Sequence, residues 1–213
     1  SRVPLYLARP DFGAGTCHLV APGFSGTIEP DRRVAHLAAH PQASLGDLSV
    51  FVRTCVAVEA FARGGLLFHA AGVVRQGLGH GLFGPSGSGK TTAAQLSPND
   101  LILNDDLVLI MPGSPKWQLW GTPFGGSWLP QAGSVPLHRL LRLIPDREDR
   151  LEALGPGTVL GEVVANSPVI NACPAWLPGL MARWQGILED VPAQALHFRK
   201  SPAFWEVVDA KCG

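Results

Sequence analysis

The segment GHGLFGPSGSGKTT, residues 79–92, is the part of the sequence that indicates the fold class most directly. Its second part matches the pattern G-x-x-x-x-G-K-[ST], the phosphate-binding loop motif known as the P-loop or Walker A motif. An apolar run at residues 79–83 precedes the glycines, and residues 91–96 suit a short helix. Because this motif belongs between a strand and a helix, we expect an α/β fold built around a nucleotide-binding loop.

The loop predicts ATP and Mg²⁺ as cofactors. Glycines allow the backbone to aim several N–H groups at one anion, and the positive end of the following helix adds to the attraction. Lys90 can reach the β- and γ-phosphates, and the Thr91 hydroxyl can ligate Mg²⁺. The alternative is a glycine turn that binds nothing. The expected nucleotide-binding residues are Gly84, Pro85, Ser86, Gly87, Ser88, Gly89, Lys90, Thr91 and Thr92.

An acidic pair, Asp105 and Asp106, follows the loop between the apolar runs 101–103 and 107–110. Phosphoryl transfer needs carboxylates at a strand end beside the loop, either to complete the metal shell or to accept the proton of the attacking hydroxyl. Two adjacent carboxylates between apolar flanks are costly to bury unpaired, so a cation is expected nearby. An ordinary β-turn with Asn104 and Asp105 at its corner is the alternative.

A single histidine, His69, interrupts the apolar run at residues 66–74, on a strand expected to neighbour the loop strand. Its position could bring the imidazole to the same end of the sheet as the phosphates. A lone histidine in such a strand can equally be a hydrogen-bonded core residue. The residues alone leave both interpretations open.

Composition excludes several classes of partner. The 213 residues carry 17 basic and 17 acidic side chains, with 46% apolar and 16% charged residues, so no basic surface for nucleic acid or anionic membrane is expected. The four cysteines form no CxxC pair, and no apolar run approaches the roughly 20 residues of a membrane span. A protein of the reducing cytoplasm, able to form a homo-oligomer, is expected.

Two regions are predicted along the chain. Residues 1–43, with strands near 5–7, 18–20 and 26–28, should form a small β-rich lead-in, and residues 44–213 one α/β domain that opens with a helix at 45–63 capped by Ser44 and Asp47. Further strands are expected at 66–74, 79–83, 101–103, 107–111, 116–120, 137–144 and 195–198, and further helices near 91–96, 147–153, 158–165, 175–189 and 204–208.

The histidine strand (67–73), the glycine loop (84–92) and the acidic pair together resemble the kinase core of the HPr kinase/phosphorylase family, over residues 65–111. That family shares its P-loop variant with the ATP-dependent phosphoenolpyruvate carboxykinases. The resemblance implies that His69 lies in the active site with Lys90, that one of Asp105 and Asp106 binds Mg²⁺, and that the other acts as the catalytic base. Which aspartate does which stays open. The Asn-x-Glu-Gly-Gly segment of the carboxykinases has no counterpart here, so decarboxylation is not expected.

The expected function is transfer of the γ-phosphoryl group of ATP to a hydroxyl, a serine of a protein, peptide or free amino acid, as in short HPr-kinase-like proteins. A non-catalytic ATP-binding regulator or assembly factor is the alternative; no Asn-Lys-x-Asp guanine motif supports a GTPase. The Gly- and Pro-rich residues 121–133 could be a lid, an acceptor clamp or a plain surface loop. Arg139 and Arg142 are either solvated charges of a strand face or contacts for the transferring phosphate.

Overall fold

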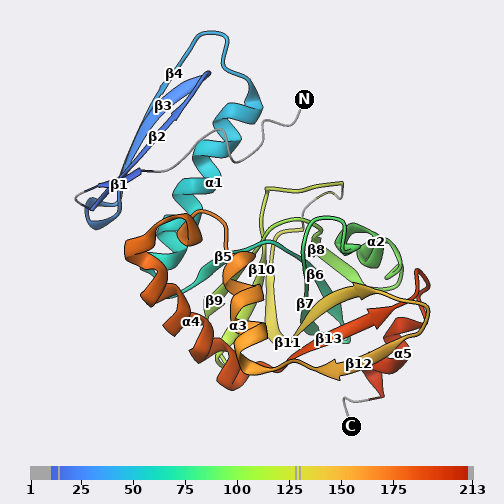
Figure 1. The fold of residues 1–213 in the computed structure, drawn as a ribbon. Coiled ribbons are helices and arrows are strands. Elements are labelled where there is room, and N and C mark those ends of the chain that lie inside the picture. The colour runs from blue at the N-terminus through green and yellow to red at the C-terminus, as the bar shows by residue number, and fades with distance from the viewer. Residues whose placement is uncertain (1–10, 14, 128, 130, 211–213) are drawn as a thin grey trace.

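A computed structural model describes residues 11–13, 15–127, 129 and 131–210. The fold is mixed α/β, with a β-rich N-terminal part and a larger mixed sheet carrying helices (Figure 1). Among these residues, no helix has the length and apolar character that crossing a membrane requires.

The N-terminal part is an antiparallel sheet whose strands follow their order in the sequence: β1 (Asp11–Gly13), β2 (Thr16–Ala21), β3 (Phe24–Glu29) and β4 (Val34–Ala39). A 3₁₀ turn, η2 (Pro30–Arg32), joins the last two strands. The expected strands near 18–20 and 26–28 are confirmed within β2 and β3, whereas the one near 5–7 lies outside the described residues. One face of the sheet is buried through Cys17, Leu19, Phe24 and Ile28.

Helix α1 (Leu45–Ala62) joins this sheet to the rest of the molecule. The predicted cap is confirmed: the Ser44 Oγ accepts from the Asp47 backbone N–H (3.1 Å), and the Ser44 backbone N–H donates to the Asp47 carboxylate (2.8 Å). The Phe51 ring packs edge-on against Phe24, 6.0 Å between centroids. A Cβ at Gly26 would lie 2.3 Å from the Phe51 ring, so glycine is required for this close approach.

Nine strands form the large sheet in the described part of the chain, in the order β5-β9-β10-β11-β7-β6-β8, with β13 pairing with β11 and β12 pairing with β13. Strands β7, β11 and β13 run parallel, and the other pairings are antiparallel. The strands are β5 (Leu66–Phe68), β6 (Ala70–Arg75), β7 (Leu78–Phe83), β8 (Leu101–Asn104), β9 (Val108–Pro112), β10 (Trp117–Gly121), β11 (Ser134–Pro145), β12 (Arg150–Ala153) and β13 (Ala193–Phe198).

Helices cover both faces of this sheet. Successive strand residues point to opposite sides, so neighbouring residues pack against different helices. Phe83 packs on the side of α1, α3 (Pro156–Ala165) and α4 (Leu177–Asp190). Its neighbour Leu82 packs on the other side, with α2 (Lys90–Gln95) and α5 (Phe204–Asp209). Two 3₁₀ turns, η3 (Ile170–Ala172) and η4 (Pro174–Trp176), connect α3 to α4.

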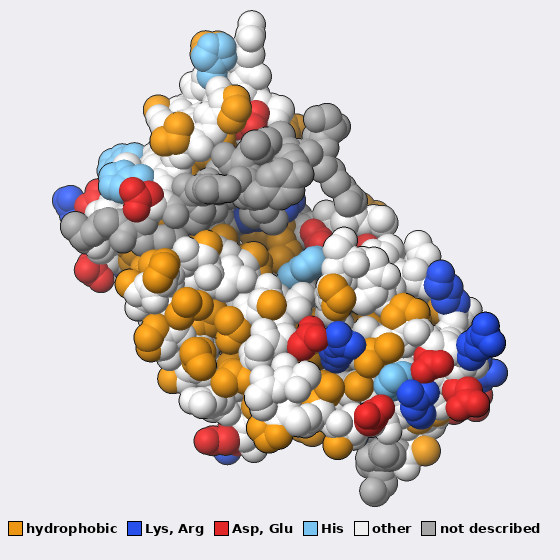
Figure 2. Space-filling view, viewed as in Figure 1, with side chains coloured by type: hydrophobic (Ala, Val, Ile, Leu, Met, Phe, Trp, Pro, Cys, Tyr) orange, Lys and Arg blue, Asp and Glu red, His pale blue; other side chains and the backbone are white. Residues whose placement is uncertain are grey.

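The surface differs between the two ends of the molecule. Figure 2 shows hydrophobic side chains gathered over α3 and α4, and Lys, Arg, Asp and Glu side chains concentrated over β12, β13 and α5. In the charged region, Arg150 pairs with Asp146 at 2.7 Å, and the Arg199 guanidinium pairs with Asp149 at 2.7 Å. On this face the charged side chains therefore gather in one region, where opposite charges pair with each other.

Two predicted elements are wrong. The helix expected near 147–153 is the strand β12, whose Leu151 packs against the core and whose backbone pairs with β13. The local sequence is rich in helix-forming charged residues, but a long-range ladder overrides that weak preference. The single strand expected at 66–74 is two strands, β5 and β6, separated at His69.

Candidate functional site

The candidate site lies where two chain segments change strand partners. The segment of β5 and β6 pairs first with β9 and then, beyond His69, with β7 and β8. The segment of β8 and β9 runs antiparallel beside it, pairing with β6 up to Asn104 and with β5 from Val108 onward. His69 and the acidic pair therefore occupy the two interruptions, which lie opposite each other. The backbone N–H of His69, freed from the ladder, donates to the Asn166 carbonyl at 2.8 Å.

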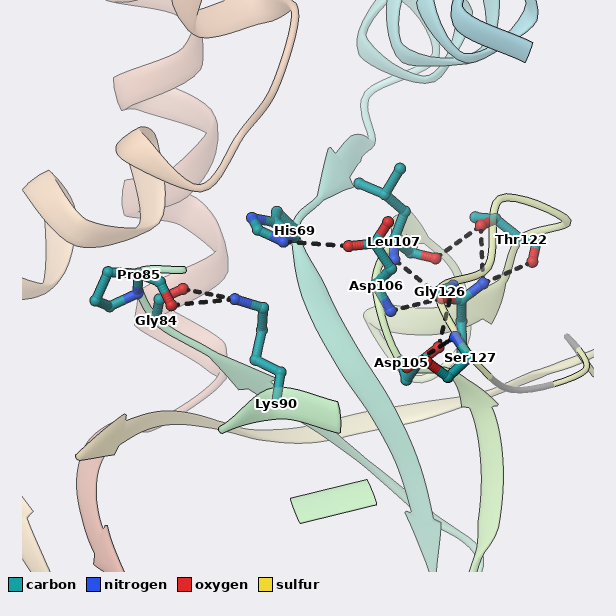
Figure 3. Close-up of polar contacts among 11 residues, drawn as sticks. His69, Gly84, Pro85, Lys90, Asp105, Asp106, Leu107, Thr122, Gly126 and Ser127 are labelled. Atoms are coloured by element: carbon teal, nitrogen blue, oxygen red, sulfur yellow. Dashed lines mark hydrogen bonds and ion pairs between the residues drawn. The ribbon is translucent and has the colours of Figure 1, made fainter. Parts of the chain in front are cut away.

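Across this gap, the His69 Nε2 lies 3.3 Å from the Asp106 Oδ1 (Figure 3). Both side chains are about one-third exposed, at 35%. The hydrogen bond from His69 lowers the pKa of Asp106 against the opposing effect of burial, and the nearby charges of Arg53 and Lys90 add to the lowering. Asp106 is thus held as a carboxylate beside a histidine that can orient it.

The turn that carries the acidic pair is built by Asn104. Its Oδ1 accepts from the backbone N–H groups of Asp106 (2.7 Å) and Leu107 (3.0 Å), an arrangement typical of an Asx-turn. Its Nδ2 donates to the Thr122 carbonyl at 2.9 Å, and the Thr122 hydroxyl donates to the Leu107 carbonyl at 2.7 Å. The acidic pair therefore lies in a turn closed by the Asn104 side chain, and this turn also positions a carboxylate beside His69.

The two aspartates point in different directions (Figure 3). Asp105 is 2% exposed, and its carboxylate accepts from the backbone N–H groups of Gly126 and Ser127 at 3.1 Å. A Cβ at Gly126 would lie 2.9 Å from that carboxylate, so the loop approaches as closely as glycine allows. Asp105 thereby anchors the Gly-rich loop, whereas Asp106 faces the histidine.

The glycine loop lies between β7 and α2, as the motif predicts. Gly84, Gly87 and Gly89 have φ values of 146°, 82° and 99°, a region that glycine adopts without the Cβ penalty. Pro85, Ser86 and Gly87 are exposed at the loop tip. The buried Ser88 hydroxyl has no hydrogen-bond partner among the described residues. Since α2 has only six residues, the loop amides and Lys90 are better placed to attract an anion than a helix dipole.

Lys90 is buried in the loop, with 8% exposure, while Thr91 and Thr92 are half-buried behind it. Its Nζ donates to the carbonyls of Gly84 (2.9 Å) and Pro85 (3.3 Å). Burial lowers the pKa of Lys90, an effect that the Asp106 carboxylate partly opposes. Lys90 and His69 therefore both act electrostatically on Asp106, from α2 and from the strand gap.

Arg53 is a site residue that sequence reasoning missed. It comes from α1, its guanidinium lies 5.6 Å from the centre of the Phe124 ring, and its charge lowers the pKa of Asp106. Its Nε is buried without a hydrogen-bond partner among the described residues. An arginine on an amphipathic helix normally extends into solvent, so no local pattern distinguishes this one.

A cavity of about 290 Å³ adjoins the His69 and Asp106 pair. Its wall also comes from α1 and from the corner between α3 and η3. The remaining lining residues are Thr54, Leu107, Ala165, Asn166, Pro168, Val169, Asn171 and Ala172. No residue of the glycine loop lines it, so the histidine and the aspartate are the predicted site residues that border this space.

The two arginines considered for phosphate contact have structural partners. Arg139 is 5% exposed, and its guanidinium donates to the Val208 carbonyl at 3.3 Å. Arg142 pairs with Glu162 of α3 at 2.7 Å. The interpretation of Arg139 as a solvated charge is wrong, because β11 is buried on both faces between helices.

Comparison with known proteins gives no further guidance: no protein-family model matches the chain, and no curated protein matches it. The function proposed next therefore rests on the site's geometry and on the sequence motifs.

Proposed function

We propose that this protein is an ATP-dependent kinase of the HPr kinase/phosphorylase type, which transfers the γ-phosphoryl group to a hydroxyl of a serine-bearing acceptor. The observation that carries the proposal is the 3.3 Å contact between His69 and the Asp106 carboxylate, on which the charge of Lys90 also acts, in a chain whose glycine loop matches the P-loop motif. A loop that only turned the chain would have no need of this arrangement.

In this proposal the loop amides and Lys90 bind the β- and γ-phosphates. The Lys90 Nζ now donates to the Gly84 and Pro85 carbonyls, and a bound phosphate would take over these bonds. The Thr91 hydroxyl and the carboxylates of Asp105 and Asp106 are hard oxygen donors. Such donors suit a Mg²⁺ ion that keeps several waters and binds phosphate. Such an ion would neutralise charge on the phosphates during transfer.

Asp106 is the better candidate for the base, because its carboxylate is ionised, partly exposed and adjacent to a cavity. It accepts the proton of the acceptor hydroxyl as that oxygen bonds to the γ-phosphorus and the bond to the β–γ bridging oxygen breaks. His69 orients the carboxylate. Asp105, whose oxygens accept loop amides, keeps the Gly-rich loop close to the site.

The test is a survey of acceptors with ATP labelled at the γ-phosphate: free serine, seryl peptides and small carrier proteins, each with wild-type protein and with Asp106→Asn. Label transfer that depends on Asp106 supports the kinase. ATP binding without transfer to any acceptor would instead favour the non-catalytic regulator. Absence of ATP binding would refute both.

A further inference from the structure

We propose that the cavity beside His69 and Asp106 is the acceptor site, and that its lining selects an alcohol without negative charge. This inference rests on the proposed kinase function and narrows its substrate class. The cavity is bordered by the proposed base and by the residue that orients it, while the glycine loop is not part of its wall. An acceptor hydroxyl in this space could therefore reach Asp106 without occupying the loop proposed for the phosphates.

The polar groups of the wall offer mainly hydrogen-bond acceptors. The Nδ2 of Asn166 donates to the Glu162 carbonyl at 2.9 Å, and the Nδ2 of Asn171 donates to the carbonyls of Val164 (3.2 Å) and Ala165 (3.1 Å). The Thr54 hydroxyl donates to the Val50 carbonyl at 2.9 Å. With these donors engaged, the Thr54 hydroxyl and the Asn171 side chain present oxygen lone pairs to a ligand, and Asn166 keeps its side-chain oxygen and one N–H. Such a wall suits a ligand that carries N–H or O–H donors.

Charge leads to the same selection. Among the lining residues, His69 and Asp106 are the titratable ones, and neither lysine nor arginine is present. A carboxylate or phosphate on the acceptor would lie near the Asp106 carboxylate and the amide oxygens, with no lining guanidinium or ammonium to compensate its lost hydration. Neutral alcohols, including a serine within a chain, avoid this penalty, whereas hydroxy acids and sugar phosphates do not.

One wall of the cavity is held in a strained backbone conformation. Val169 has φ 73° and ψ −61°, and the Ile170 backbone N–H donates to the Pro168 carbonyl at 2.9 Å, which together define a γ-turn of the rare positive-φ form. A β-branched residue persists there only when its surroundings enforce it. The same corner supplies the Asn166 carbonyl that binds the His69 backbone N–H. The cavity wall and the histidine are therefore positioned by one rigid corner.

The experiment compares two probes of equal shape and different charge, N-acetyl-L-serinamide and N-acetyl-L-serine, as phosphoryl acceptors. We expect kcat/KM for the neutral probe to exceed that for the anion by roughly tenfold or more, because the probe's carboxylate would lie near the Asp106 carboxylate in a wall that holds no lysine or arginine. Ala172, which lines the cavity and is exposed, allows two variants. Ala172→Trp should abolish use of both probes, and Ala172→Lys should raise the relative use of the anion. Ala175→Trp and Ala175→Lys, at an exposed position outside the wall, are the matched controls.

The outcomes separate this inference from the kinase proposal. Equal phosphorylation of both probes by wild-type protein would support the kinase and overturn the charge selection. If neither probe is phosphorylated, saturation-transfer NMR measures whether N-acetyl-L-serinamide binds. Binding that Ala172→Trp removes and Ala175→Trp retains would uphold the acceptor cavity without the kinase. Absence of binding, or binding that Ala172→Trp leaves intact, would overturn it.

Discussion

The His69 Nε2 lies 3.3 Å from the Asp106 Oδ1 because both residues occupy interruptions between antiparallel strands that change partners at the same place. A regular ladder through residues 66–75 would have fixed the backbone N–H of His69 within the sheet. Instead that N–H binds the Asn166 carbonyl, and the histidine sits at the edge of a cavity. A break in secondary structure thus brings together the side chains on which the proposed chemistry depends.

Lys90→Ala is expected to weaken ATP binding and to abolish phosphoryl transfer, because the β- and γ-phosphates lose their cationic side-chain partner. Isothermal titration calorimetry measures the affinity, and label transfer measures the activity. Lys200→Ala, at an exposed lysine outside the loop, is the control. Unchanged affinity and activity in Lys90→Ala would remove the nucleotide-binding proposal.

Alkaline pH should weaken ATP binding by wild-type protein earlier than an ordinary lysine would allow. Burial places the pKa of Lys90 below its usual 10.5, so the ammonium loses its proton as the pH rises through that lowered value. Calorimetry across this range should show the affinity falling before pH 10.5 is reached. An affinity independent of pH up to 10.5 would contradict the role of Lys90.

Asp106→Asn and Asp105→Asn should have different effects. The first removes the proposed base and should lower kcat by at least ~10² with little change in melting temperature. The second replaces one buried carboxylate oxygen that accepts loop amides, and should lower the free energy of unfolding by about 1–3 kcal/mol. Thermal melts and turnover measured on the same preparations distinguish them. Near-normal turnover of both variants at saturating Mg²⁺ would defeat the kinase proposal.

His69→Ala should slow transfer by roughly 10² or more while the fold survives, because Asp106 loses the group that orients it. The pKa of Asp106 should also rise, so the acid limb of the kcat/KM profile moves to higher pH. His69→Gln, which keeps a donor near the carboxylate, should partly restore both properties. A large fall in melting temperature with normal kcat would instead mark His69 as a structural residue.

His80, on β7, should make the protein sensitive to acid. Burial lowers its pKa from 6.5 to about 4, and the ring packs against His138 and Trp205. The unfolded chain binds more protons between these values, so stability is fully present above pH 6.5 and is lost as the pH falls toward 4. The contribution is about 3 kcal/mol. Denaturant unfolding across this range measures the free energy of unfolding as a function of pH. Its pH dependence should be flatter in His80→Phe than in wild-type protein or in the exposed-site control His40→Phe.

Short-range sequence patterns were enough to predict the elements that interactions between neighbouring residues form. The Ser44 and Asp47 cap, the glycines that adopt positive φ and the apolar run before them act within a few residues, so their spacing predicts α1, the loop and β7. The proximity of His69 to the acidic pair was expected only from a family resemblance, and the structure places Asp106 beside the histidine.

Neighbouring residues alone account for the order of a capped helix, a histidine strand, a glycine loop and an acidic turn, since each of these depends on short-range interactions. Contacts between distant segments fix the orientation of Asp106 toward His69 and of Asp105 toward Gly126, and they make residues 150–153 a strand. The same long-range packing brings Arg53 of α1 and the strained Val169 to the site around Asp106. These outcomes depend on pairing and packing between segments far apart in the chain, where many weak contacts together outweigh local preference.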